Sequence, residues 1–134
     1  MIVVDTNIIA YLYLCGERTA QAEKLLRIDS EWTAPRLWKS EMRNILALYL
    51  GKGLLSLQEA QSVMRESSDL MRDREYDVVS FLVLNLVASS SCSAYDCEFV
   101  ALAQELEKKL VTVDKKILQE FPATAVRLDV FVRE

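Results

Sequence analysis

The 134-residue sequence contains no histidine, and this absence excludes several kinds of active site at once. Ser-His-Asp triads, Cys-His pairs and zinc sites with histidine ligands all need an imidazole group. Any catalysis must therefore use carboxylates, hydroxyl groups, lysine or a bound metal ion. The sequence has 20 acidic residues, and these become the first candidates for a functional site.

Cysteine, glycine and proline are also scarce. The three cysteines, Cys15, Cys92 and Cys97, form no C-x-x-C pair. An odd count without a secretory pattern indicates reduced, mostly buried thiols. Three glycines and two prolines leave no visible linker or repeat. Since this length fits one domain, we expect residues 1–134 to form a single domain.

Long hydrophobic runs are missing as well. The longest apolar stretch, residues 78–88, is interrupted by Ser80 and Asn85. It is shorter than the roughly 20 residues that a membrane-spanning helix needs. The segment 1–7 contains an aspartate and no leading basic residue, so it does not resemble a signal peptide. We therefore expect a cytoplasmic protein without a membrane partner.

What the sequence does contain is an alternation of short apolar runs and helical patterns. β-branched apolar runs predict strands, and apolar residues at helical spacing predict helices. The expected strands are 1–4, 32–34, 76–79, 110–113 and 125–128. The expected helices are 7–14, 19–28, 35–50, 56–71, 81–88, 94–108 and 115–120. This alternation predicts an α/β fold whose central parallel sheet is covered on both faces.

Two aspartates directly follow predicted strands. Asp5 comes after the run 2–4, and Asp114 comes after the run 111–113. Ligands of open parallel sheets bind beyond the carboxyl ends of the strands, which is where both side chains would lie. Each aspartate could instead cap the helix that follows it, because aspartate is a favoured N-cap. The two roles are compatible.

Two further acids, Glu41 and Asp96, lie on helix faces that are otherwise apolar. The other members of these faces are Leu37, Ile45 and Leu48 for Glu41, and Phe99, Val100, Ala103 and Leu106 for Asp96. An ionised carboxylate turned inward costs several kcal/mol unless it is paired or bound to metal. Two simpler explanations stay open. Glu41 could form a salt bridge to Lys39 or Arg43, and Asp96 could complete a capping box that begins at Ser93.

The four acids could converge on one pocket. A site made of carboxylates alone selects Mg²⁺ or Mn²⁺. Such a site suits phosphodiester hydrolysis, because metal ions generate hydroxide from water and stabilise charge on the phosphorus and on the leaving oxygen. The net charge of −4 argues against a nucleic-acid binder unless bound cations neutralise some of these acids.

The same residues resemble PIN-domain proteins, in particular the VapC-like toxins of bacterial and archaeal toxin–antitoxin pairs. The matching segments are 1–7, 40–44, 93–96 and 111–114, and their order and spacing cover nearly the whole chain. The resemblance implies a three-layer α/β/α sandwich and a ribonuclease that depends on Mg²⁺ or Mn²⁺. The residues it implies as metal ligands and catalytic acids are Asp5, Glu41, Asp96 and Asp114.

The resemblance also implies partners and supporting residues. Family members are commonly homodimers, and the toxins are silenced by a small antitoxin protein. Thr6, Asn7 and Thr112 match polar positions that support the pocket, although each is also explained as a cap or turn residue. Glu98 lies outside the pattern. On a helix it points well away from Asp96, so we interpret it as a surface acid, with an accessory ligand as the alternative.

Two other functions fit parts of this sequence. Phosphohydrolases with an aspartate nucleophile usually carry a second aspartate two residues further on, and that position is Asn7 here. A non-catalytic PIN-like module that binds RNA or protein is the second alternative, and the set of four acids argues against it. The basic residues near the acids are more simply solvated, so RNA-binding residues stay unassigned. They are Arg36, Lys39, Arg43, Lys115 and Lys116.

Overall fold

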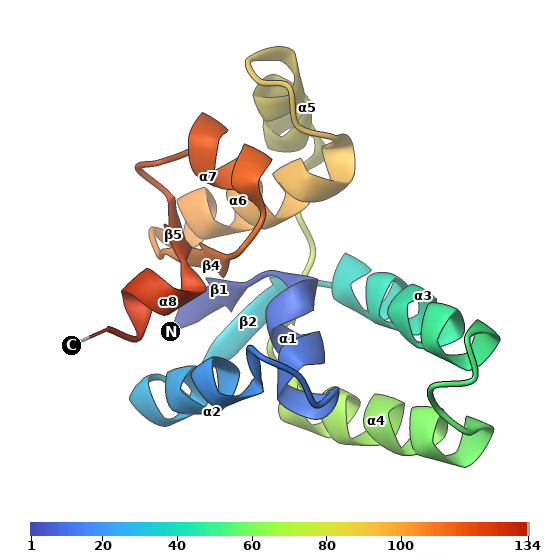
Figure 1. Ribbon diagram of the computed structural model, residues 1–134. Coiled ribbons are helices and arrows are strands. Elements are labelled where there is room, and N and C mark those ends of the chain that lie inside the picture. Colours follow the sequence, from blue (N-terminus) through green and yellow to red (C-terminus); the bar gives the residue numbers. More distant parts are fainter. Residues whose placement is uncertain (134) are drawn as a thin grey trace.

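A central parallel sheet of five strands separates two layers of helices in the computed structural model, which describes residues 1–133 (Figure 1). The strand order is β3-β2-β1-β4-β5, and every neighbouring pair is parallel. The strands are β1 (Ile2–Val4), β2 (Trp32–Pro35), β3 (Glu75–Tyr76), β4 (Leu110–Thr112) and β5 (Ala125–Arg127). The expected α/β/α sandwich is confirmed.

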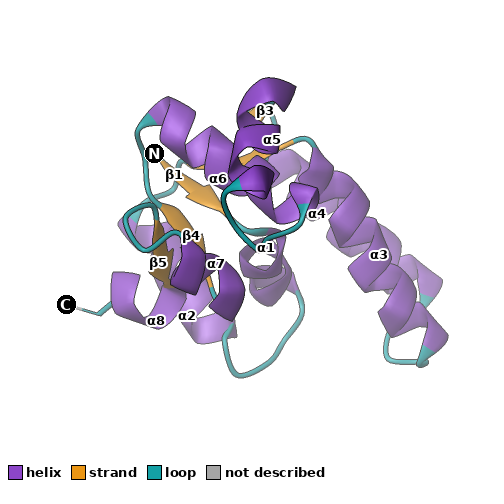
Figure 2. Cartoon of the chain, turned by 90° about the horizontal axis from the view of Figure 1, so that it is seen from above, coloured by secondary structure: helices purple, strands orange, loops and turns teal. Residues whose placement is uncertain are grey.

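The helices cover both faces of this sheet. They are α1 (Thr6–Tyr13), α2 (Thr19–Ile28), α3 (Leu37–Gly51), α4 (Leu57–Leu70), α5 (Ser80–Ala88), α6 (Ala94–Leu106), α7 (Lys115–Glu120) and α8 (Leu128–Phe131). Helix α6 contacts β1, β2 and β4 on one face and packs against α5. On the other face α1 contacts α2, α3 and α4 (Figure 1). Figure 2 shows α3 leading away from the sheet.

The two central strands are apolar because helices cover them on both sides. Val3, Val4, Leu110 and Val111 are fully buried in β1 and β4. A strand covered on both faces has no solvent side, so it reads as a continuous apolar run rather than as an alternating one. Asp5 and Asp114, the acids that follow these two strands, therefore lie at the carboxyl edge of the sheet, directly beyond its most buried strands.

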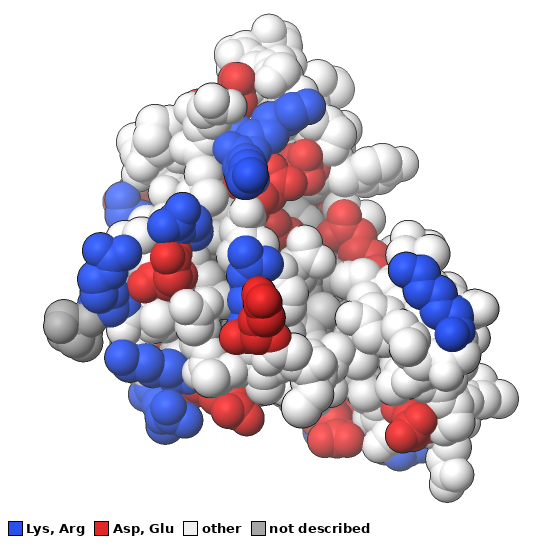
Figure 3. All heavy atoms as spheres, viewed as in Figure 1, with Lys and Arg blue, Asp and Glu red and all other residues white. Residues whose placement is uncertain are grey.

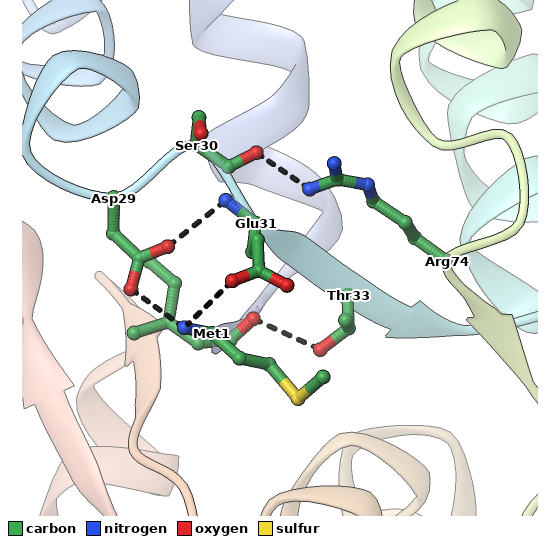
Figure 4. A network of polar contacts seen from close by, with 7 residues as sticks. Met1, Asp29, Ser30, Glu31, Thr33 and Arg74 are labelled. Carbon is green, nitrogen blue, oxygen red and sulfur yellow. Dashed lines mark hydrogen bonds and ion pairs between the residues drawn. The ribbon is translucent and has the colours of Figure 1, made fainter.

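Polar contacts hold the beginning of β1 in place (Figure 4). The amino group of Met1 lies 2.9 Å from a carboxylate oxygen of Asp29 and 4.0 Å from one of Glu31. The Thr33 hydroxyl donates to the backbone oxygen of Ile2 at 2.9 Å. Ion pairs that stay partly exposed contribute little to the free energy of unfolding. We therefore interpret the contacts of the Met1 amino group as fixing where β1 begins beside β2.

The end of β2 and the edge strand differ from the sequence prediction. Pro35, expected in the first turn of a helix, is the last residue of β2, and the Arg36 amide donates to the Tyr76 carbonyl at 3.2 Å. The edge strand is Glu75–Tyr76 rather than 76–79, because Val79 already forms the N-cap of α5. An edge strand has only one neighbour, so two residues are enough to pair with β2.

The last predicted strand also ends earlier than expected. Leu128, expected to end it, begins the short helix α8, which the sequence pattern did not indicate. Helix α6 ends at Leu106 rather than at 108, because Glu107 adopts a left-handed conformation with φ 56° and closes the helix. Cys92 and Cys97 are buried as expected, whereas Cys15 is exposed. Within residues 1–133 all three cysteines are free, and no helix there is long and apolar enough to cross a membrane.

The buried face of α3 is shifted by one residue from the face that was expected to point inward. The side chains of α3 that are buried are Trp38, Met42 and Leu46, whereas Leu48 is 57% exposed. The expectation for Leu48 was wrong. The face that contains Glu41 lies beside the buried one, at the border between the core and solvent.

Candidate active site

The four acids singled out in the sequence line one pocket of about 460 Å³. Asp5 follows β1, Glu41 lies on α3, Asp96 lies in the first turn of α6 and Asp114 follows β4. The structure therefore brings together side chains that are up to 109 positions apart in the sequence. Figure 3 shows acidic atoms gathered in a hollow between the α6–α7 region and α3.

Asp5 is both a helix cap and a wall of the pocket. Its side chain is 9% exposed, and its Oδ1 accepts a hydrogen bond from the Thr6 amide at 2.8 Å. Its Oδ2 accepts from the Thr112 hydroxyl at 2.7 Å. Burial raises the pKa of Asp5 from 3.8 to about 6 despite these bonds, and the charges of Asp96 and Asp114 add to the rise.

Thr112 connects two of the acids across neighbouring strands. Its buried hydroxyl donates to Asp5 and accepts a hydrogen bond from the Asp114 amide at 3.0 Å. The Asp114 side chain in turn accepts from the Ile117 amide at 3.0 Å and so caps α7. Asp5 and Asp114 are therefore helix caps, as one interpretation of the sequence held, and pocket acids as well.

Glu41 is half-buried and is held by a threonine rather than by a cation. Its Oε1 accepts from the Thr6 hydroxyl at 2.6 Å. Among the described residues Glu41 forms no salt bridge, and Lys39 instead lies 3.6 Å from Glu75. Burial raises the pKa of Glu41, and the nearby negative charges raise it further. The salt-bridge explanation for Glu41 is therefore wrong.

Asp96 lies in the first turn of α6 and lines the pocket. The Ser93 hydroxyl accepts from the Asp96 amide at 3.1 Å, which is one half of the expected capping box. Burial raises the pKa of Asp96, as does the charge of Asp114, while hydrogen bonds to Ser93 and the charge of Lys116 oppose the rise. Ser93 therefore caps α6, while the Asp96 side chain lines the pocket.

Glu98 does not belong to the pocket lining, as expected, but it is less remote than a surface acid. Its side chain is half-buried. Its charge is near enough to contribute to the raised pKa of Glu41. The interpretation of Glu98 as a surface acid therefore holds only in part, and its alternative role as an accessory ligand stays a prediction.

Several other side chains complete the pocket wall. Asn7, predicted as a supporting residue, lines the pocket. Ser40, Asn44 and Tyr95 also line it, and the sequence analysis assigned them no role. Asn44 lies three positions after Glu41, so helical spacing could have placed it on the same face. Tyr95 is 62% exposed, and only its position next to Asp96 could have indicated it.

The donor chemistry of this pocket fits a hard divalent cation. Its polar lining offers carboxylate, amide and hydroxyl groups, and oxygen donors of this kind are preferred by Mg²⁺ and Mn²⁺. Across residues 1–133 no three Asp, Glu, Cys or His side chains stand close enough to enclose a metal by themselves. An ion that keeps several of its own water molecules, as Mg²⁺ does, needs no closed cage.

Comparisons with known proteins agree with this geometry. A family model described as PIN domain matches residues 2–123. Ribonuclease VapC3 from Pyrobaculum aerophilum is 31% identical over 125 residues, covering 91% of this chain and 95% of that protein. The crystal structure of PAE2754 from Pyrobaculum aerophilum has a TM-score of 0.79 at 17% identity and covers 98% of this chain and 92% of that chain.

A second solved structure has the same fold. A toxin–antitoxin complex from Klebsiella pneumoniae matches with a TM-score of 0.69 at 17% identity. The match covers 96% of this chain and 98% of that chain. At such low identity, these two structural matches establish a shared fold.

Proposed function

The chain belongs to the PIN-domain family, and from this premise we propose that it is a metal-dependent endoribonuclease of the VapC type. The observation that supports this most strongly is the meeting of four carboxylates in one open pocket at the carboxyl edge of the sheet. Its relative with 31% identity is named a ribonuclease, which agrees with the proposal. The pocket is open to solvent, as cleavage of a long polymer requires.

In this proposal the four acids hold Mg²⁺ or Mn²⁺ and are the catalytic residues: Asp5, Glu41, Asp96 and Asp114. The bound metal supplies an activated water and neutralises the charge that develops on the phosphate. The raised pKa values of Asp5, Glu41 and Asp96 support a cation site, because burial first, and the neighbouring acids second, make uncompensated negative charge unfavourable there.

The chain's own polar side chains position the acids and the substrate. Thr112 donates to the Asp5 carboxylate, and Thr6 donates to the Glu41 carboxylate. The Ile117 amide donates to the Asp114 carboxylate, so three of the four carboxylates are oriented by hydrogen bonds within the chain. Asn7 and Asn44 line the pocket with amide groups that can donate to phosphate or ribose oxygens.

The partners of this nuclease would be an RNA substrate, a small antitoxin and a second copy of the chain, with the cytoplasm as its location. The structural similarity to a protein solved in a toxin–antitoxin complex supports the antitoxin. Exposed leucines at the end of α3, in the following loop and at the beginning of α4 support a homodimer: Leu48, Leu54 and Leu57 are each more than half exposed. Clustered apolar surface of this kind marks protein contacts. We also propose that the whole chain is a single domain.

Incubation of the purified protein with a defined RNA tests this function. With Mg²⁺ or Mn²⁺ we expect internal cleavage that generates new RNA ends, and with excess chelator we expect none. Full cleavage in chelator, with bound metal shown to be absent by elemental analysis, would contradict metal dependence. Binding of RNA without cleavage under every metal condition would favour the non-catalytic module.

A further inference from the structure

A second hollow of about 560 Å³ lies at the same edge of the sheet and is lined by basic side chains. Its lining residues are Arg18, Val113, Lys115, Leu118, Gln119 and Arg127. The three cations come from three separate elements, at the beginning of α2, the beginning of α7 and the end of β5. Arg18, Val113 and Arg127 also line a neighbouring hollow, to which Glu17 and Asp129 contribute, so the carboxylates of this region lie on one side of the basic hollow.

The basic hollow adjoins the acidic pocket. Val113 and Lys115 line the basic hollow, while Asp114 between them lines the acidic pocket. Consecutive Cα atoms are about 3.8 Å apart, so a single turn of chain separates the two hollows. Figure 3 shows groups of basic atoms on the same face as the acidic atoms. One nucleic-acid strand that crosses this face would meet both.

The cations differ in how far their charge is already neutralised. Arg127 pairs with Asp129, with 2.9 Å between Nη2 and Oδ2. Arg18 lies over the Tyr11 ring at 5.6 Å and donates to its hydroxyl at 3.3 Å, which holds the guanidinium without adding a negative charge. Within residues 1–133, neither Arg18 nor Lys115 forms an ion pair. These two charges are available to an anion.

We propose that the basic hollow binds a backbone phosphate of the RNA strand, next to the phosphate that is cleaved. This inference rests on the proposed ribonuclease function. A chain with a net charge of −4 and an acidic active site repels RNA, so contact with the backbone has to come from a local cluster of cations. A guanidinium presents a planar pair of donors to phosphate, and an ammonium adds a point charge.

The salt dependence of RNA binding tests this proposal. The affinity of a labelled single-stranded RNA is measured by fluorescence anisotropy in chelator, for wild type, Arg18→Gln, Lys115→Gln and the double variant. The slope of log affinity against log salt falls by about 0.7 for each lost phosphate contact on a single strand. At 0.1 M salt this corresponds to about fivefold weaker binding for each single variant and about 25-fold for the double variant.

Matched controls separate a local effect from a change in overall charge. Lys52→Gln and Arg65→Gln remove exposed cations from the far end of α3 and from α4, and we expect affinity within about twofold of wild type. Arg18 and Lys115 are exposed, so both variants should keep the melting temperature of wild type. An equal loss of affinity in the four single variants would overturn the proposal, because non-specific attraction between the protein's positive charges and RNA would explain it.

The outcomes also distinguish this proposal from the ribonuclease function. Cleavage by wild type combined with unchanged RNA affinity in the double variant overturns the basic hollow alone. Absence of cleavage with loss of RNA affinity in the double variant overturns the ribonuclease function and keeps the hollow as an RNA site. Polyglutamate serves as a probe for an acidic protein partner. The proposal is also overturned if the Arg18 and Lys115 variants lose tight polyglutamate binding but bind RNA as well as wild type does.

Discussion

Replacement of Asp5 by asparagine should stabilise the metal-free protein at neutral and alkaline pH. Burial raises the pKa of Asp5 from 3.8 to about 6 in the folded protein. At 1.36 kcal/mol for each pH unit, this rise corresponds to about 3 kcal/mol of unfavourable free energy once the buried carboxyl is ionised. An asparagine side chain has nearly the same shape and never carries this charge.

The hydrogen bonds of Asp5 determine how much of this increase in the free energy of unfolding remains in the variant. Asparagine keeps an acceptor for the Thr6 amide but offers Thr112 a donor in place of an acceptor, so the Thr112 hydroxyl hydrogen loses its partner. A lost hydrogen bond costs about 1 kcal/mol. We therefore expect Asp5→Asn to be about 2 kcal/mol more stable than wild type at pH 8 without metal.

The pH dependence gives the sign of the effect. Because the folded pKa of Asp5 is higher than the unfolded one, the folded state binds the proton more tightly, and wild type loses stability as pH rises from 4 to above 6. The variant lacks this loss. The advantage of the variant should therefore appear between pH 4 and pH 7 and stay constant above that range.

Urea unfolding of both proteins in chelator, from pH 4 to pH 8, measures this difference. Added Mn²⁺ should reverse the ranking at about a hundred times its dissociation constant, because a ligand at that concentration stabilises the fold by about 2.7 kcal/mol, and the variant should gain much less. A metal-free Asp5→Asn protein that is more than about 1 kcal/mol less stable than wild type at pH 8 would refute the reasoning. Asp5 would then be a structural cap.

Three further predictions concern the threonines and the surface. Thr6→Val removes the donor to Glu41, so single-turnover cleavage should slow by about tenfold while RNA affinity stays unchanged. Thr6→Ser keeps the hydroxyl and should cleave at the wild-type rate. Equal cleavage rates for the valine and serine variants would contradict the positioning role of Thr6. Thr112→Val leaves buried Asp5 and Asp114 groups without a partner and should cost about 1–3 kcal/mol in urea unfolding, whereas no loss would argue against the link. Light scattering should find a homodimer at micromolar concentration, and a monomer there would contradict it.

The fold and the four acids could be predicted because their signals are local. Asp5 and Asp114 each follow an apolar strand, and the topology of a parallel sheet brings the ends of such strands to one edge. Glu41 and Asp96 each interrupt an apolar helix face. These patterns depend on a few consecutive residues and do not require knowledge of which strands are neighbours.

The connections between the acids could not be predicted in this way. Thr112 bridges Asp5 and Asp114 only because β4 lies directly beside β1, although 107 positions separate Thr112 from Asp5. Strand order is a long-range property that no local pattern contains. Leu48 was wrong for a different reason. The buried face of α3 is set by what packs against the helix, and it consists of Trp38, Met42 and Leu46, which leaves Leu48 outside it.

Single-turnover cleavage by Asp96→Asn and Glu98→Gln tests the central claim most directly. Both variants change one acid to its amide within a single turn of α6, but only Asp96 lines the pocket. We expect Asp96→Asn to slow RNA cleavage in Mn²⁺ by at least about 100-fold, and Glu98→Gln to stay within about threefold of wild type. Equal losses in the two variants, or full activity of Asp96→Asn, would contradict an active site built from Asp5, Glu41, Asp96 and Asp114.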